Sequence, residues 1–275
     1  MRQIYCAEKL SGDHDTSFIG FDDEYIPEGI VSGRAPADAV HVYDCAVLPV
    51  IPFDENGMLN TPCSADRLSC GDIRRMVKED GIILAGKADE ALRERFPFAE
   101  IYDYLSREEL SLKNAVSTAE GAVQIALEEL PVTLNGLRVL IVGMGRIGTA
   151  LSGILRGFGA EVAAAVRNER GVAKARIAGV RPVYTGDITG DCELVFNTVP
   201  GMIFDKSMLG RFSRNTLFID LASKPGGIDL AAAGEMGIRV IWALGLPGKT
   251  APVTAGEIIA DTVSSILSER SESIE

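Results

Sequence analysis

A glycine-rich turn between an apolar strand pattern and an amphipathic helix pattern is the feature that most limits the folds open to this chain. Residues 138–142 are apolar after the first position, the glycines follow as Gly143-x-Gly145-x-x-Gly148, and an amphipathic helical pattern comes next. Gly143 permits a tight turn, Gly145 lets the backbone approach a phosphate, and Gly148 lets the helix pack closely on the strand. A second apolar segment, 161–166, completes a βαβ unit, so the pattern predicts a dinucleotide site. A glycine turn without a ligand is the alternative.

The residues after this second strand bear on the choice of cofactor. A carboxylate there would bind the ribose 2′-hydroxyl of NAD and repel a 2′-phosphate. Here Arg167 and Asn168 come first, and Glu169 is followed by Arg170. Because a guanidinium suits a phosphate, we expect NADP, with NAD less favoured. The alternative is that Arg167 and Arg170 are solvated surface charges.

Composition limits the class of protein. With 275 residues, 47% of them hydrophobic, the chain has enough core for two domains of a soluble enzyme. A net charge of −12 argues against nucleic acid and anionic membrane surfaces as partners. No apolar run reaches the roughly 20 residues that cross a bilayer, so we expect a cytoplasmic protein. The five cysteines form no C-x-x-C pair, which supports neither a metal site nor a disulfide framework.

The first hundred residues predict a small α/β domain. Apolar strands are expected within 40–50 and 81–86, with a helix over 72–79 between them, which indicates a small parallel sheet. Ser117 and Glu120 then form a capping-box pattern for a helix that continues to residue 130 and bridges two domains.

The second half predicts a doubly wound sheet. Further apolar strands are expected within 193–200, 216–223 and 237–244, and polar or small residues follow each of them. In such sheets the ligand binds outside the carboxyl ends of the strands. A last helix over 252–268, with a capping pattern at Thr254 and Glu257, precedes a polar tail that we expect to be frayed.

Several motifs, in order, resemble one family. They are Leu48-Pro-Val50, Asn114-Ala-Val-Ser-Thr-Ala-Glu-Gly121, Val142-Gly-Met-Gly-Arg-Ile-Gly148, Asn197-Thr-Val-Pro200, Ile219-Asp-Leu-Ala-Ser-Lys-Pro-Gly-Gly227 and Gly245-Leu-Pro-Gly-Lys-Thr-Ala-Pro-Val-Thr-Ala-Gly256. The chain thereby resembles the family of dipicolinate synthase A subunits from about Arg2 to the last helix. The resemblance implies NADP-dependent oxidation of a dihydrodipicolinate-type intermediate to dipicolinate in sporulating bacteria. It also implies an oligomer in which the partner is a flavoprotein-like B subunit.

The resemblance further implies an architecture similar to that of D-2-hydroxyacid dehydrogenases. We expect an α/β fold with an N-terminal α/β substrate or partner domain over 1–115, a bridging helix over 116–131 and a doubly wound parallel-sheet Rossmann domain over 132–250. A C-terminal helix over 251–275 would return to the N-terminal domain. The family usually opens with a strand and a Gly-Gly-Asp turn before Arg2 and Gln3, so we expect either a translation start upstream of Met1 or a sheet lacking its first strand.

Aromatising a dihydropyridine dicarboxylate needs a hydride acceptor, cations for two carboxylates and a base. We expect Lys224 and Lys249 to supply the cations and Glu120 the base, although Glu120 as a capping residue and Lys224 as a solvated turn residue are the alternatives. Substrate-binding hydroxyls are expected from Thr61, Ser64, Ser117 and Thr118. The expected cofactor contacts are Gly143, Gly145, Arg146, Ile147, Gly148, Arg167, Asn197, Thr198, Pro200, Ser223 and Leu246. For Thr198 and Ser223, ordinary turn chemistry is an equal alternative.

The sequence leaves two other functions open. One is a stand-alone hydroxyacid-type dehydrogenase, which should carry an arginine and a histidine–carboxylate pair. The chain has two histidines, and neither follows the glycine-rich unit. The other is a non-catalytic NADP-binding subunit that regulates a catalytic partner.

Overall fold

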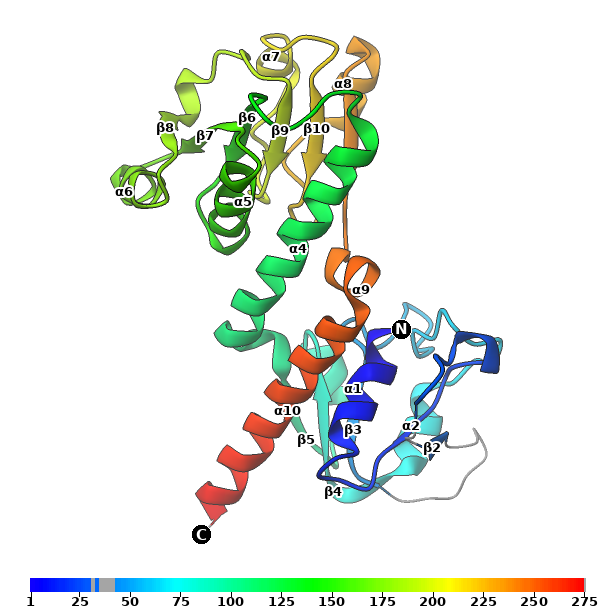
Figure 1. Cartoon of the computed structure of the whole chain (residues 1–275). Helices are drawn as coiled ribbons and strands as arrows, with labels where there is room; N and C mark the ends of the chain where they lie inside the picture. Colours follow the sequence, from blue (N-terminus) through cyan, green and yellow to red (C-terminus); the bar gives the residue numbers. More distant parts are fainter. Residues whose placement is uncertain (31–32, 35–42, 275) are drawn as a thin grey trace. The chain divides into compact units, whose positions relative to one another are not determined.

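The computed structural model describes residues 1–30, 33–34 and 43–274, which form two units (Figure 1). Unit 1 comprises Met1–Lys113 and Pro252–Glu275, and unit 2 comprises Asn114–Ala251. Helix α4 (Glu108–Glu129) contributes residues to both.

Unit 2 is built on six parallel strands in the order β11-β10-β9-β6-β7-β8. Their bounds are β6 (Arg138–Val142), β7 (Glu161–Val166), β8 (Arg181–Tyr184), β9 (Leu194–Asn197), β10 (Leu217–Asp220) and β11 (Arg239–Trp242). After β8 the chain returns to the other side of β6, so β6 and β9 are neighbours at the point where the winding reverses. This confirms the predicted doubly wound α/β fold and five of its six strand positions, whereas β8 was not predicted.

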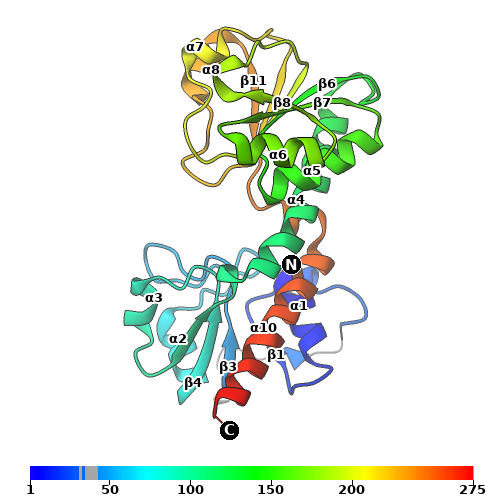
Figure 2. The same ribbon diagram turned by 90° about the vertical axis from the view of Figure 1, so that its left-hand side faces the viewer.

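Helices cover both faces of this sheet because alternate strand residues point to opposite sides. The helices of unit 2, besides α4, are α5 (Arg146–Gly157), α6 (Glu169–Ile177), the short η3 (Thr185–Asp187), α7 (Lys206–Leu209), α8 (Leu230–Met236) and α9 (Leu246–Thr250). Buried residues of α4, α5 and α9 pack with β6, β9 and β10 on one face. On the other face Phe204, Phe212 and Phe218 pack edge to face with centroids 5.0 to 5.8 Å apart, in one cluster with buried residues of α7 and α8. These two helices lie side by side (Figure 2).

Unit 1 contains a smaller parallel sheet in the order β3-β4-β5. Its elements are α1 (Arg2–Leu10), β1 (Ser17–Phe18), η1 (Asp23–Tyr25), β2 (Gly33–Arg34), β3 (Tyr43–Val47), α2 (Cys70–Met76), β4 (Val77–Ala85), α3 (Glu90–Arg95), β5 (Glu100–Asp103), η2 (Tyr104–Ser106) and α10 (Pro252–Ile274). Helices α1 and α10 lie side by side over one face (Figure 1), and α2 and α3 cover the other. Residues 40–42 of the predicted first strand lie outside the described residues.

The helix predicted over 72–79 is wrong at both ends. Helix α2 begins at Cys70, because Ser69 and Asp72 form a reciprocal capping box, and it ends at Met76. Val77 pairs with Tyr43 of β3, so the next residues are drawn into the sheet as the start of β4. Pairing with a segment far away in the chain therefore overrides the local helical pattern.

Neither predicted Ser/Thr-x-x-Glu capping pattern stands at the N-cap of its helix, although the last helix does begin at the predicted residue, Pro252. Helix α4 begins at Glu108, so Ser117 and Glu120 lie more than two turns inside it, and the bridging helix spans 108–129 rather than 116–131. Helix α10 begins at Pro252, which places Thr254 inside its first turn. Ser117 cannot cap from inside α4, because the N–H groups that follow it already have partners in the helix. Thr254 lies past the N-cap position of α10.

Helix α10 extends beyond the predicted end at residue 268, to Ile274. Nε of Arg270 lies 2.6 Å from Oε2 of Glu100, and Nη2 of Arg107 lies 2.6 Å from Oε2 of Glu269. These ion pairs to the rest of unit 1 hold the polar segment that we expected to be frayed.

Candidate nucleotide site in unit 2

The three glycines of the turn after β6 differ in what a side chain at each position would meet. Gly143 has φ of 94°, and a Cβ there would lie 2.6 Å from Oγ1 of Thr198. A Cβ on Gly148 would lie 2.0 Å from the carbonyl oxygen of Gly143. By contrast, no described atom lies within 4 Å of the Cβ position of Gly145. The first and third glycines therefore close the turn, and the second faces open space.

The open side of the turn is the beginning of α5. Gly145 is the N-cap and offers no side chain to the first-turn N–H groups, and Thr149 N–H donates to the Gly145 carbonyl at 3.0 Å. Unsatisfied N–H groups and the helix dipole make such a terminus attractive to an anion. Arg146 is exposed in this turn and Ile147 is half-buried.

The turn is held from both neighbouring strands. Thr198, directly after β9, donates its backbone N–H at 3.0 Å and its hydroxyl at 2.8 Å to the Val142 carbonyl. Gly143 N–H donates to the Ala165 carbonyl of β7 at 2.9 Å. The Thr198 hydroxyl proton therefore supports the turn, and exposed Pro200 follows at the same edge of the sheet.

Asn197, expected to line the cofactor site, is fully buried. Its Nδ2 donates to Oδ1 of Asp220 at 2.8 Å and to the Val199 carbonyl at 3.0 Å, and its Oδ1 accepts from Val199 N–H at 3.2 Å. The Asn197 side chain therefore stabilises the carboxyl edge of the sheet from the protein interior.

The buried partner of Asn197 is a carboxylate that the sequence analysis did not single out. Asp220 is 2% exposed, and its oxygens also accept the N–H groups of Ala222 at 3.0 Å and Gly227 at 2.9 Å. Trp242 donates its indole N–H to the Ala222 carbonyl at 2.9 Å. The Asp-Leu-Ala-Ser motif was the available signal, since an acid at the end of an apolar strand must find donors when it is buried.

These bonds support a loop after β10, residues 222–227, that presents polar groups outward. Ser223 and Lys224 are exposed, whereas Gly226 and Gly227 are buried. A Cβ on Gly227 would lie 2.4 Å from Nδ2 of Asn197, so the loop backbone packs directly on the amide. The structure thus brings the glycine turn, Thr198 and Ser223 to the carboxyl edge of one sheet.

Two exposed arginines follow β7: Arg167 comes directly after the strand, and Arg170 lies in the first turn of α6. The intervening Glu169 accepts a hydrogen bond from the Tyr184 hydroxyl of β8, and Asn168 caps α6 by accepting Gly171 N–H at 3.0 Å. The carboxylate of Glu169 is therefore hydrogen-bonded to a residue of the neighbouring strand β8.

Helix α9 lies against α4 within unit 2. A Cβ on Gly121 would lie 2.9 Å from Oγ1 of Thr250, and 3.3 Å from Cβ of Leu246, which is buried. Lys249 of α9 and Glu120 of α4 are exposed. Two of the three predicted catalytic side chains, Glu120 and Lys249, therefore lie on helices that touch, while Leu246, a predicted cofactor contact, belongs to the core.

The four predicted substrate hydroxyls are divided between the units. In unit 1, Ser64 donates to Oδ1 of Asp22 at 2.9 Å, and Thr61 approaches the carbonyls of Leu59 and Asp66 at 3.5 and 3.4 Å. On α4, Thr118 donates to the Asn114 carbonyl at 2.8 Å, and Ser117 is 3% exposed. To donate to a substrate carboxylate, the hydroxyl of Ser64 or Thr118 would have to give up its present hydrogen bond.

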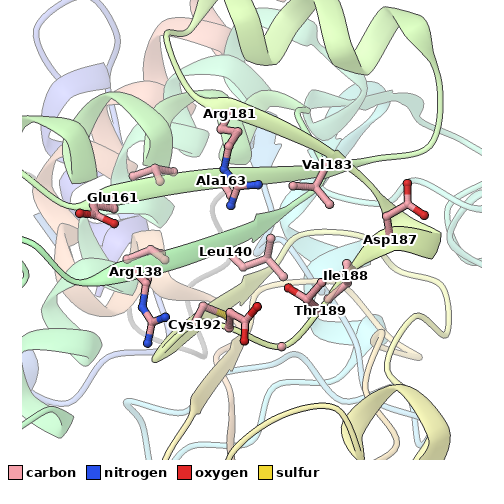
Figure 3. A pocket seen from close by; sticks show the side chains of 14 residues that line it. Arg138, Leu140, Glu161, Ala163, Arg181, Val183, Asp187, Ile188, Thr189 and Cys192 are labelled. Carbon is pink, nitrogen blue, oxygen red and sulfur yellow. The ribbon is translucent and has the colours of Figure 1, made fainter.

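A separate hollow of about 430 Å³ opens at the other edge of the sheet. It is lined by the amino ends of β6, β7 and β8 and by residues 187–192, including Arg138, Glu161, Arg181 and Cys192 (Figure 3). Ligands of doubly wound sheets bind at the carboxyl ends, so this hollow is not the nucleotide site. In the described part of the chain, no three His, Cys, Asp or Glu residues could hold a metal ion, and no helix is long and apolar enough to cross a membrane.

Sequence comparisons identify similar proteins. The family model for the N-terminal domain of the dipicolinate synthase A subunit matches residues 1–104. The model described as "D-isomer specific 2-hydroxyacid dehydrogenase, NAD binding domain" matches residues 107–224. The A subunit of dipicolinate synthase from Bacillus subtilis (strain 168) is 28% identical over 283 residues, covering 98% of this chain and 93% of the relative.

Solved structures give the same grouping. The A chain of dipicolinate synthase from Bacillus subtilis matches with a TM-score of 0.84 and 28% identity over 98% of this chain and 93% of that one. The corresponding A subunit from Bacillus halodurans matches with a TM-score of 0.86 and 27% identity over 97% and 94%. A transhydrogenase from Sinorhizobium meliloti, with a TM-score of 0.72 and 17% identity over 96% and 87%, shares the fold.

Proposed function

We propose that this chain, which belongs to the family of dipicolinate synthase A subunits, oxidises a dihydrodipicolinate-type intermediate to dipicolinate with NADP⁺ and a B subunit. Its second unit is an NAD-binding domain of the dehydrogenase type. The observation that carries the proposal is the glycine turn, open at Gly145, on the same sheet edge as the loop that presents Ser223 and Lys224. We place the activity in the cytoplasm of a spore-forming cell.

The residues of this chain would bind and orient the reactants. A bound nicotinamide supplies the hydride acceptor. The first turn of α5 would hold the pyrophosphate of a bound cofactor, and the Asn197–Asp220 pair holds the loop 222–227 in place at the same edge of the sheet. Lys224 and Lys249 are the proposed cations for substrate carboxylates, and Glu120 is the proposed base that takes the proton released on aromatisation.

The preference for NADP rests on the end of β7. Arg167 and Arg170 are exposed there, and the carboxylate of Glu169 is engaged by Tyr184. A guanidinium binds a phosphate through two parallel hydrogen bonds, whereas NAD would present only a hydroxyl at this point. This arrangement favours a 2′-phosphate.

The test is turnover of freshly generated dihydrodipicolinate with NADP⁺, followed by the ultraviolet absorbance of dipicolinate. The wild-type chain is assayed by itself and with the candidate B subunit. The Gly148→Ala variant, in which the turn is blocked, is assayed with the same partner. Product from wild-type chain plus partner, and none above the uncatalysed rate with Gly148→Ala, is expected. Tight NADPH binding with no product from the wild-type pair would contradict the enzymatic proposal and favour a regulatory nucleotide-binding subunit.

A further inference from the structure

The hollow at the amino edge of the unit 2 sheet lies where the connection between two parallel strands carries no α-helix. This connection, residues 185–193 between β8 and β9, is described throughout and contains only the short η3. Parallel strands are usually joined through a helix that packs on the sheet. Here a loop borders a space of about 430 Å³ against β6, β7 and β8 instead, and that volume lies in the range of small-molecule sites.

The sheet side of the hollow is a row of cross-strand neighbours. Arg181 of β8 is paired in register with Ala163 of β7, and Ala163 is paired with Leu140 of β6. Residues paired in this way share one face of the sheet, and the small side chain of Ala163 leaves space on that face. Figure 3 shows the Arg181 side chain directed along the row towards Leu140. Val183 and Ile188 extend the apolar lining.

Two further lining groups offer no unpaired charge to a ligand. Burial raises the pKa of Cys192 to about 12, so its thiol is neutral near pH 7. Arg138 is charged but has a partner, because its Nη2 lies 2.8 Å from Oε1 of Glu193. The charges open to a ligand therefore belong to other residues of the lining.

These open charges have both signs and do not pair with one another. Among the described residues, the guanidinium of Arg181 has no hydrogen bond or ion pair, and neither do the carboxylates of Asp187 and Asp191. Arg181 stands on the sheet, whereas the two aspartates stand on the loop that closes the hollow (Figure 3). Glu161, at the start of β7, adds a third carboxylate without a partner. A positive wall and a negative wall thus border one apolar floor.

We propose that this hollow binds an α-amino acid with an apolar side chain. The Arg181 guanidinium binds the ligand carboxylate through charge-assisted hydrogen bonds, and Asp187 and Asp191 attract its ammonium group. The aliphatic side chain packs on Leu140 and Ala163. A ligand with a single charge would leave one wall without a partner, so a zwitterion is more complementary than a simple acid or amine.

The site is independent of the proposed function. The hollow lies at the amino end of β6, and the glycine turn follows the carboxyl end of the same strand. The five residues of β6 span roughly 16 Å, so one small ligand cannot occupy both places.

Three probes of one carbon skeleton test the proposal by ligand-observed NMR titration of the full chain. L-Leucine carries both charges, 4-methylpentanoate lacks the ammonium group, and 3-methylbutylamine lacks the carboxylate. We expect leucine to bind with a dissociation constant of about 1 mM or below. Each singly charged probe should bind at least about 10-fold more weakly, the lower limit for losing a hydrogen bond to a charged group.

Two variants assign the charges. Arg181→Gln and the double variant Asp187→Asn/Asp191→Asn should each weaken leucine binding by about 10- to 150-fold. Arg176→Gln is the matched control, because it removes an exposed arginine of α6 that does not line the hollow, and it should bind leucine as the wild type does. Melting temperatures should be equal in all variants, since every replaced side chain is exposed.

Three results would overturn the proposal. One is no leucine binding to the wild-type chain up to about 10 mM, ten times the expected dissociation constant. Another is an equal loss of leucine affinity in Arg176→Gln and Arg181→Gln, which would reduce the effect to net charge. The third is equal affinity for leucine and 4-methylpentanoate, which would exclude a zwitterion site. NADPH affinity should be the same in all variants, and its loss in Arg181→Gln would contradict the separation of the two sites.

Discussion

Nδ2 of Asn197 donates to Oδ1 of Asp220 at 2.8 Å, and both side chains are buried at the carboxyl edge of the unit 2 sheet. The same aspartate accepts the backbone N–H groups of Ala222 and Gly227. One carboxylate thereby joins the end of β9 to the loop that presents Ser223 and Lys224.

Asp220→Asn should therefore loosen this loop. An amide cannot accept from all three donors, and each buried donor left unpaired costs about 1 to 3 kcal/mol. We expect a lower free energy of unfolding by this amount or more, and weaker NADPH binding, measured by urea denaturation and fluorescence titration. Asp187→Asn, at an exposed position in the same unit, should change neither, and wild-type stability in Asp220→Asn would contradict the role assigned to the carboxylate.

Gly148→Ala should abolish nucleotide binding. The added Cβ would meet the Gly143 carbonyl oxygen at 2.0 Å, so α5 must move away from the turn that its N-terminus supports. Gly153 of the same helix provides the control, because no described atom lies within 4 Å of its Cβ position. Gly153→Ala should retain NADPH affinity and gain about 0.5 to 1 kcal/mol of stability. Nucleotide binding by Gly148→Ala at wild-type affinity would show that the turn is not the site.

Arg167→Gln should separate the two nicotinamide cofactors. We expect about 10-fold or greater loss of affinity for NADPH, since a hydrogen bond to a charged group is worth roughly 1.5 to 3 kcal/mol, with NADH affinity unchanged. Arg176→Gln, which removes an exposed arginine of α6, is the control for net charge. Equal losses for both cofactors in Arg167→Gln would argue against a 2′-phosphate contact.

The protein should lose stability in alkali through a buried thiol. Burial, aided by nearby Cys45, raises the pKa of Cys6 from 9.0 to about 12. Between these values the unfolded chain binds fewer protons than the folded one, so the free energy of unfolding falls as pH rises. A shift of this size corresponds to up to about 4 kcal/mol.

Denaturation curves of wild type and Cys6→Ala over this range measure the effect. The alkaline decline should be shallower in the variant, and the difference between the two proteins should stay constant from about pH 6 to pH 8. If the free energy of unfolding falls equally in the two proteins above pH 9, Cys6 is not a source of the alkaline loss of stability.

The local pattern was sufficient for five of the six strands of unit 2 and for the turn after β6, whereas β8, whose residues are exposed or half-buried, was not predicted. A buried parallel strand reads as a short apolar run, and a turn with φ of 94° at Gly143 or a carbonyl at 2.0 Å from Gly148 tolerates no side chain. These requirements act within a few residues, so the doubly wound sheet and its candidate nucleotide site were predictable from the order of the amino acids.

Helix ends and the state of individual polar groups depended on contacts between distant segments. Pairing of Val77 with Tyr43 ended α2 early, and the ion pairs of Glu269 and Arg270 extended α10. Whether Asn197 faces a ligand or a buried carboxylate is decided by which chain segments pack around it. Local propensity holds no information about such partners, so these points required the folded arrangement of the chain.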